Sequence, residues 1–128
     1  MWFRKHTRES LISFEERVKQ AFLDKLIHAP IHLSAGNEDQ LLKVFEQVHK
    51  DDWVFSTWRS HYHALLKGIP EDDLFQQILE GRSMYVMSKE HRFMAGSIVA
   101  GMLPIALGMA EGIKRKGGTE KAWVFVGD

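Results

Sequence analysis

The sequence contains no cysteine, which excludes disulfides, thiolate zinc sites and cysteine nucleophiles. It also lacks an excess of charge of either sign, because 17 basic residues balance 17 acidic ones. No global field draws such a chain to nucleic acid or to an anionic membrane, and we expect neither as a partner. An apolar run of about 18 residues is missing, as is a signal peptide pattern, so a cytoplasmic protein is the expectation.

What the chain does contain is sufficient for a hydrophobic core. Its 128 residues, 45% of them hydrophobic, match the size and composition of one domain. A chain of this length usually buries somewhat over ~60% of the surface that it exposes when unfolded. Neither a repeat nor a linker divides it, so we predict a single domain spanning residues 1–128.

Apolar residues recur at helical spacing in three segments. The first is 10–28, in which Ser13 and Glu16 have the spacing of a capping box and offer a later start. The second is 38–50, which begins with acidic residues that suit the positive end of a helix dipole. The third is 70–81, with proline and acidic residues at its start and glycine at its end.

Small residues are concentrated in segment 95–112, which a basic stretch and the glycine pair at 117–118 follow. Small side chains every few positions let a helix backbone approach another backbone or a ligand closely. Each glycine costs a helix roughly 1 kcal/mol relative to alanine, so this many predict a packing reason.

Two segments are predicted to be strands. Residues 53–57 are rich in β-forming residues, and 122–126 are five apolar residues without alternation, bounded by turn residues. The unalternating run is typical of a parallel strand buried on both faces. Such a strand needs neighbours on both edges, so we expect the rest of the sheet to come from further chain or from another subunit.

Asp128 and Arg59 are the residues most suited to chemistry. In open parallel sheets, ligands bind beyond the carboxyl ends of the strands, where Asp128 follows the predicted strand 122–126. A carboxylate there suits a hard cation such as magnesium, although a turn or capping role is the alternative. The planar fork of Arg59 suits a phosphate or carboxylate, with a surface ion pair as the alternative.

Two histidines follow Arg59, at positions 61 and 63. Without a third ligand they make a poor metal site, and we expect partly buried, hydrogen-bonding side chains. A hydrolase triad could be composed from Ser60, His61 and Asp128. No Gly-x-Ser-x-Gly turn supports it, so this function is set aside.

Seven short segments then form an ordered set over residues 31–128. They are 31–38 (IHLSAGNE), 51–61 (DDWVFSTWRSH), 66–68 (LKG), 81–84 (GRSM), 96–100 (GSIVA), 104–108 (PIALG) and 124–128 (VFVGD). In this order they resemble the motifs of the alpha subunits of thiamine-diphosphate-dependent 2-oxo acid dehydrogenases, of the pyruvate, branched-chain 2-oxo acid and acetoin dehydrogenase type. The first 30 residues add an N-terminal helix before this family-like region.

The resemblance implies a fold and a set of roles. The fold would be α/β, a truncated thiamine-diphosphate-binding fold, mostly helical with one or two parallel strands. Arg59 matches the arginine that grips the cofactor diphosphate, and Trp58 stands where the family usually has a tyrosine that also reaches it. The residues matching other cofactor-contacting positions are Ser97 and Val99 beside the aminopyrimidine, and Gly127 of the Gly-Asp-Gly motif. Asp128 of the same motif matches the ligand of the magnesium ion.

The resemblance also implies what this chain needs from elsewhere. The family's second metal ligand and the histidine-bearing loop that serves the lipoyl group lie further along than residue 128, and the activating glutamate comes from a beta subunit. We therefore expect oxidative decarboxylation of a 2-oxo acid, or acetoin cleavage, only in an oligomer such as the family's heterotetramer, and an inactive isolated chain. The alternative is a non-catalytic helical interaction module. Trp58, Ser97 and Tyr85, which depart from the family pattern, favour it.

Overall fold

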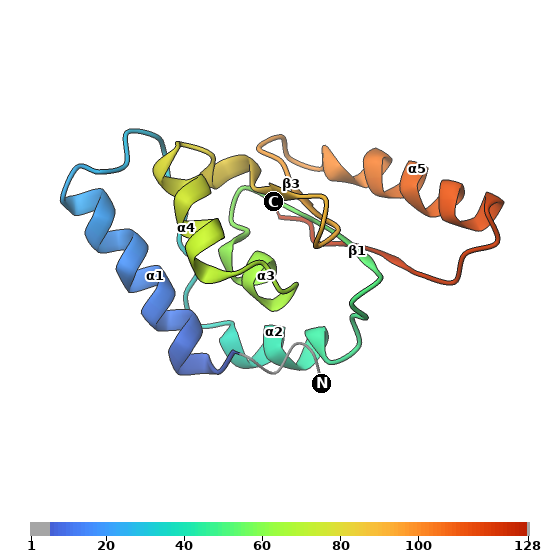
Figure 1. Cartoon of the computed structure of the whole chain (residues 1–128), viewed down its shortest axis with the longest axis horizontal. Coiled ribbons are helices and arrows are strands. Elements are labelled where there is room, and N and C mark those ends of the chain that lie inside the picture. The colour runs from blue at the N-terminus through green and yellow to red at the C-terminus, as the bar shows by residue number, and fades with distance from the viewer. Residues whose placement is uncertain (1–5, 128) are drawn as a thin grey trace.

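The computed structural model describes residues 6–127 as helices around a small, mainly parallel sheet (Figure 1). Helices α1 to α4 lie together on one side, and α5 lies apart from them beyond the sheet. The elements, in chain order, are α1 (Arg8–Leu23), α2 (Glu38–Phe45), β1 (Trp53–Ser56), α3 (His61–Leu66), α4 (Glu71–Leu79), the 3-10 turn η1 (Ser83–Tyr85), β2 (Met87–Ser88), β3 (Phe93–Ala95), α5 (Met102–Arg115) and β4 (Ala122–Val124).

The sheet has the strand order β2-β3-β1-β4. Strand β1 is parallel to both neighbours, with Val54 opposite Phe93 of β3 and opposite Trp123 of β4, whereas β2 joins β3 antiparallel. The described residues thus contain three parallel strands, and the prediction of one or two was wrong. Strand β3 was not predicted from the sequence, because three residues are too few to display a period. Its pairing with β1 defines it instead.

The central strand is β1, whose last three residues are buried. Val54 contributes to the core shared with α1 to α4, and its neighbour Phe55 points to the opposite face, toward α5. Within residues 6–127, β4 is paired with β1 alone, so the prediction that the final strand is buried on both faces, with a second neighbour from further chain or another subunit, stays a prediction. Strand β4 lies at the edge of the sheet, and its three residues are only partly buried.

Helix α1 begins earlier than the capping box at Ser13 predicted. Thr7 is the N-cap: its side chain accepts a hydrogen bond from the Ser10 amide at 3.2 Å, and the Ser10 hydroxyl accepts one from the Thr7 amide at 2.9 Å. The predicted stripe is correct in its first part but not at Phe22 and Leu26, which are exposed. The helix ends at Leu23, so the 3.6-residue period does not extend to residue 28.

Thr7→Ala is expected to lower the free energy of unfolding by about 1 kcal/mol, the usual value of an N-cap side chain. The alanine leaves the Ser10 amide without its acceptor. Thr7→Ser keeps the hydroxyl and should retain most of the stability. Urea denaturation followed by far-UV circular dichroism measures the difference, and equal losses in both variants would contradict the capping role.

The other predicted helices are present, and one further helix was not predicted. Helices α2 and α4 form, and Gly81 ends the latter with a positive φ of 85°. Helix α3 was not predicted from the aromatic and cationic segment after β1. Helix α5 packs on β4 and β1, and a Cβ built on Gly108 or Gly112 would meet nothing within 4 Å. The close approach predicted for segment 95–112 is therefore found before the helix, at Gly96 and Gly101, and not along the helix itself.

The core lies between α1 to α4 and one face of the sheet. Its apolar side chains come from every one of these elements and include Leu11, Phe14, Val18, Phe45, Tyr62, Leu65, Leu74, Ile78 and Phe93. The two buried residues of helix α5, Ala106 and Ile113, are not part of this cluster. In the described part of the chain, no helix has the length and apolar character needed to cross a membrane.

Candidate functional site

Because β1, β3 and β4 are parallel, their carboxyl ends lie along the same side of the sheet, which we call its carboxyl edge. Two backbone hydrogen bonds continue the pairing past the strands, from the Gly96 amide to the Ser56 carbonyl at 3.1 Å and from the Phe125 amide to the Phe55 carbonyl at 2.9 Å. The segments that follow these strands carry all five predicted cofactor-binding residues. This edge is where ligands bind in open parallel sheets.

A cleft of about 540 Å³ lies at this edge, within the size range of small-molecule sites. It contains three of the predicted residues, Trp58, Arg59 and Gly127. The remaining lining comes from segment 34–41, from α3 and from the two strand ends, and consists of Ser34, Asn37, Leu41, Thr57, His63, Phe125 and Val126. The motif in segment 31–38 could have pointed to Ser34 and Asn37, and the motif in segment 124–128 to Phe125.

Ser97 and Val99 lie at the same edge but do not line this cleft. Both are exposed on the connection between β3 and α5. The connection is tight, because a Cβ on Gly96 would come within 2.5 Å of the Met102 methyl group and Ala100 has a positive φ of 58°. The structure therefore brings Arg59 and Gly127 together and leaves Ser97 and Val99 apart from them. Asp128, the predicted metal ligand, lies outside the described residues.

Arg59 is the only arginine or lysine among the described residues that line the cleft. Its side chain is exposed and donates one hydrogen bond, from Nη1 to the Leu33 carbonyl at 3.1 Å. Guanidinium has five N–H donors in a planar fork, so most of the fork can still face an anion. Burial, and then the neighbouring Arg59 guanidinium, lower the pKa of His32, which precedes Leu33.

His63 forms the inner wall of the cleft. Its Nδ1 is 2.6 Å from the Ser56 hydroxyl oxygen, and its ring stacks on Phe125 with the centroids 4.2 Å apart. Burial lowers the pKa of His63 from 6.5 to about 4, so the ring is neutral at neutral pH. It can exchange hydrogen bonds with a ligand but does not add a second positive charge beside Arg59.

His61 lies in the core, although it is only two residues from His63. Its Nδ1 is 2.5 Å from a Glu15 carboxylate oxygen and its Nε2 is 2.8 Å from the Ser83 hydroxyl oxygen. The Ser60 hydroxyl has no partner among the described residues, so it is not paired with His61. The expectation of buried, hydrogen-bonding histidines is confirmed, and the Ser60–His61 arrangement gives a hydrolase no support.

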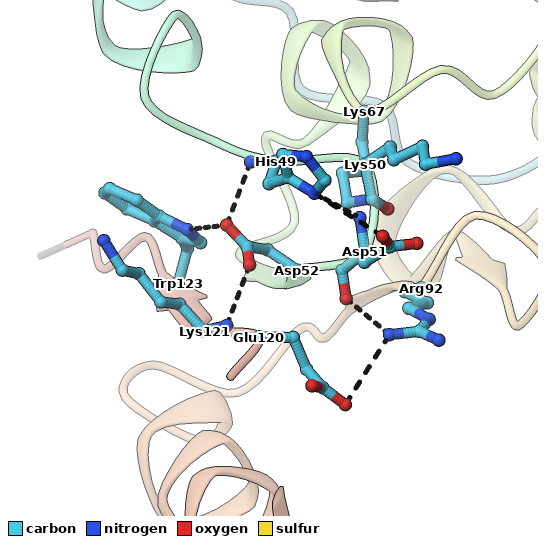
Figure 2. Close-up of polar contacts among 9 residues, drawn as sticks. All are labelled: His49, Lys50, Asp51, Asp52, Lys67, Arg92, Glu120, Lys121 and Trp123. Carbon is cyan, nitrogen blue, oxygen red and sulfur yellow. Dashed lines mark hydrogen bonds and ion pairs between the residues drawn. The ribbon is translucent and has the colours of Figure 1, made fainter. Parts of the chain in front are cut away.

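A second polar cluster lies at the opposite edge of the sheet, where β1 and β4 begin (Figure 2). The buried carboxylate of Asp52 accepts three hydrogen bonds, from the amides of His49 and Lys121 and from the indole nitrogen of Trp123. Burial by itself raises the pKa of Asp52, but these hydrogen bonds outweigh it and the net pKa is lowered. Asp52 thus ties the beginning of β4 to the segment before β1, which is a structural role.

The polar groups that line the cleft bear on two kinds of ligand, an anion and a metal ion. A guanidinium, the hydroxyls of Ser34 and Thr57, the amide of Asn37 and the side-chain-free Gly127 suit an anionic oxygen ligand such as a diphosphate. Within residues 6–127, no three His, Asp or Glu side chains are grouped so that they could hold a metal ion.

Comparisons with known proteins identify several relatives of this chain. The pyruvate dehydrogenase E1 component subunit alpha of Porphyra purpurea is 30% identical over 77% of this chain and 31% of its own length. Subunit alpha-3 of the chloroplastic enzyme of Arabidopsis thaliana is 32% identical over 77% of the chain and 25% of its own length. The alpha subunit of acetoin:2,6-dichlorophenolindophenol oxidoreductase of Bacillus subtilis is 29% identical over 90% and 38%.

The chain thus spans between a quarter and two fifths of the length of these curated relatives. The match with the family model is broader, because it extends over residues 6–128. It includes α1, the segment 31–38 that contributes Ser34 to the cleft, and the three parallel strands. The chain belongs to the family of the dehydrogenase E1 component.

Proposed function

We propose that this chain is part of the alpha subunit of a thiamine-diphosphate-dependent 2-oxo acid dehydrogenase, and that the Arg59 cleft holds the diphosphate end of the cofactor. The observation that carries the proposal is the position of Arg59. It lies beside Gly127 in a cleft at the carboxyl edge of a parallel sheet, and it is the lining residue that carries a positive charge at neutral pH.

Each residue of the cleft has a proposed role that follows from its chemistry. The Arg59 fork matches two phosphate oxygens, and the Thr57 hydroxyl lies within the same wall as a further donor. Gly127 has no side chain to keep a phosphate away from the backbone. His63 is neutral and stacked on Phe125, so it contributes a wall without a charge. Trp58 can donate through its indole nitrogen.

Thiamine diphosphate, when bound, supplies the nucleophile and the electron sink for removing carbon dioxide from a 2-oxo acid. A diphosphate with more than one negative charge is not balanced by Arg59 alone, so the proposal includes magnesium, with Asp128 as one ligand. The substrate class is a 2-oxo acid such as pyruvate, or an acetoin-type compound, as in the names of the relatives. A beta subunit is the proposed partner, and the isolated chain is expected to show no turnover.

Arg59→Ala is expected to weaken binding of thiamine diphosphate by about 10- to 100-fold, because a charge-assisted hydrogen bond is worth about 1.5–3 kcal/mol. The measurement is isothermal titration calorimetry of the chain with magnesium and either thiamine diphosphate or inorganic pyrophosphate. Arg59→Lys keeps the charge without the planar fork, so its affinity should lie between those of the unchanged chain and Arg59→Ala.

Arg115→Ala is the matched control, because it removes an exposed arginine that pairs with Glu111 on the same helix, away from the cleft lining. Its affinity should equal that of the unchanged chain. Absence of heat with both ligands in the unchanged chain, or an equal loss in both variants, would remove the diphosphate from this cleft.

One observation favours the second candidate, a non-catalytic interaction module. Helix α5 exposes Leu103, Ile105 and Leu107, with Leu107 at 71% exposure. Exposed apolar side chains of this kind are typical of a surface that another protein covers. The same calorimetry separates the candidates, because a module without cofactor binding gives no heat with thiamine diphosphate or pyrophosphate.

A further inference from the structure

We infer that Glu15 and His61 are positioning residues that orient Arg59 through a single peptide group, the one between Leu33 and Ser34. The inference rests on the proposed function, in that Arg59 is the group whose orientation matters. It concerns two buried residues, Glu15 on α1 and His61 at the start of α3, neither of which lines the cleft.

The two side chains form a buried pair. Glu15 is 5% exposed and His61 is 1% exposed, and Glu15 Oε1 lies 2.5 Å from His61 Nδ1. The other ring nitrogen of His61 is 2.8 Å from the hydroxyl oxygen of Ser83, which is fully buried. Both nitrogens of the ring are therefore used, and the ring fixes the orientation of the carboxylate. Removing either partner would leave a buried polar group unpaired.

The second oxygen of Glu15 points to the cleft wall. Glu15 Oε2 accepts a hydrogen bond from the Ser34 amide at 2.8 Å. The carbonyl of the same peptide group, that of Leu33, accepts a hydrogen bond from Nη1 of Arg59 at 3.1 Å. One peptide group thus lies between a carboxylate on its N–H side and a guanidinium on its C=O side, so both charges act on its dipole in the stabilising direction.

This arrangement explains how an exposed arginine can have a defined position. A surface guanidinium ordinarily loses rotamer entropy when it binds an anion, and prior orientation reduces that loss. The Leu33 carbonyl provides the orientation, and Glu15 holds the carbonyl in place. A second buried carboxylate, Glu38, holds the same loop further on, by accepting hydrogen bonds from the Gly36 amide at 3.1 Å and the Tyr62 hydroxyl at 2.9 Å.

The test compares Glu15→Gln with Glu16→Gln, the same change at the neighbouring residue, whose side chain is 66% exposed. The first readout is nuclear magnetic resonance of the ¹⁵N-labelled chain, following the Ser34 amide and the Arg59 Nε–H. In Glu15→Gln the Ser34 amide proton should move upfield and the Arg59 signal should shift and broaden. In Glu16→Gln both signals should stay in place. Unmoved signals in a folded Glu15→Gln chain would overturn the inference.

The second readout is the affinity for inorganic pyrophosphate with magnesium. Glu15→Gln is expected to weaken it about five-fold, less than Arg59→Ala, because the guanidinium is still present but is no longer oriented. A merely structural role predicts a lowered melting temperature with unchanged affinity in the folded protein. That result would contradict the positioning role.

Two further variants cover the case in which Glu15→Gln does not fold. Ser83→Ala removes the far end of the network without touching the Leu33–Ser34 peptide, and it should destabilise the chain but leave the Arg59 signal unchanged. His61→Gln releases Glu15 on its other side and should move both signals. A moved Arg59 signal in Ser83→Ala together with unmoved signals in His61→Gln would refute the inference. If the unchanged chain does not bind pyrophosphate, the proposed function fails, but the resonance comparison still decides whether Glu15 orients Arg59.

Discussion

Asp52→Asn is expected to lower the free energy of unfolding by about 3 kcal/mol at neutral pH. Three N–H groups converge on the two carboxylate oxygens: the His49 amide and the Trp123 indole on Oδ2 at 2.9 Å each, and the Lys121 amide on Oδ1 at 2.8 Å (Figure 2). Asparagine replaces one acceptor oxygen by a donor, so at least one buried N–H loses its partner and faces another N–H. An unsatisfied buried group costs ~1–3 kcal/mol, and more when the lost partner is charged.

Asp51→Asn is the matched control, since it makes the same chemical change one residue earlier. The Asp51 side chain is 55% exposed, and its carboxylate lies 3.6 Å from Nδ1 of the His49 ring. A surface change of this kind alters stability by less than about 0.5 kcal/mol. Urea denaturation followed by circular dichroism measures both variants. Similar losses at the two positions would show that Asp52 does not hold β4.

Acidification is expected to destabilise the protein through His63. The pKa of its ring is about 4 in the folded protein, because the ring is buried, against 6.5 in the unfolded chain. Between these values the unfolded chain binds a proton that the folded protein does not, so the free energy of unfolding rises with pH. The contribution is complete above pH 6.5 and is lost as the pH falls toward 4. Its limit is about 3 kcal/mol, because one pKa unit is worth ~1.4 kcal/mol.

His63→Gln should flatten this part of the stability curve. Glutamine can still reach a hydrogen-bond partner but does not titrate, so the difference between the unchanged and variant proteins should shrink as the pH is lowered from 7 to 4. His28→Gln is the control, because His28 is exposed. Urea midpoints at half-unit pH steps provide the curves. Parallel curves for the unchanged chain and His63→Gln would show that the pKa of His63 is the same in the folded and unfolded states.

Local patterns predicted the long helices and the strands β1 and β4, but missed β3 and α3. Segment 70–81 combined an apolar stripe with acidic residues at one end and glycine at the other, and α4 (Glu71–Leu79) formed within it. The three residues of β3 and the six of α3 contain too little periodicity to be recognised. Their structure comes from contacts with β1 and with the other helices, which no local window contains.

The candidate site also contains residues that the sequence could identify and residues that it could not. Arg59 could be selected from its chemistry and from the motif around it, and the structure places it with Trp58 and Gly127. The prediction for Asp128 stays a prediction. The Glu15–His61 pair could not be predicted, because 46 residues separate its members and neither a helical nor a strand period spans that distance.

The parallel pairing of β1 with β4 also has a consequence for how the chain folds. Asp52 and Lys121, which bond across the beginning of these strands, are 69 residues apart, so the pairing closes a long loop before any of its contacts stabilise the protein. During synthesis on a ribosome, α1 to α4 can collapse around β1 while the partner strand is still inside the exit tunnel. In that interval one side of β1 presents unpaired backbone groups, to which another chain or a chaperone can bind.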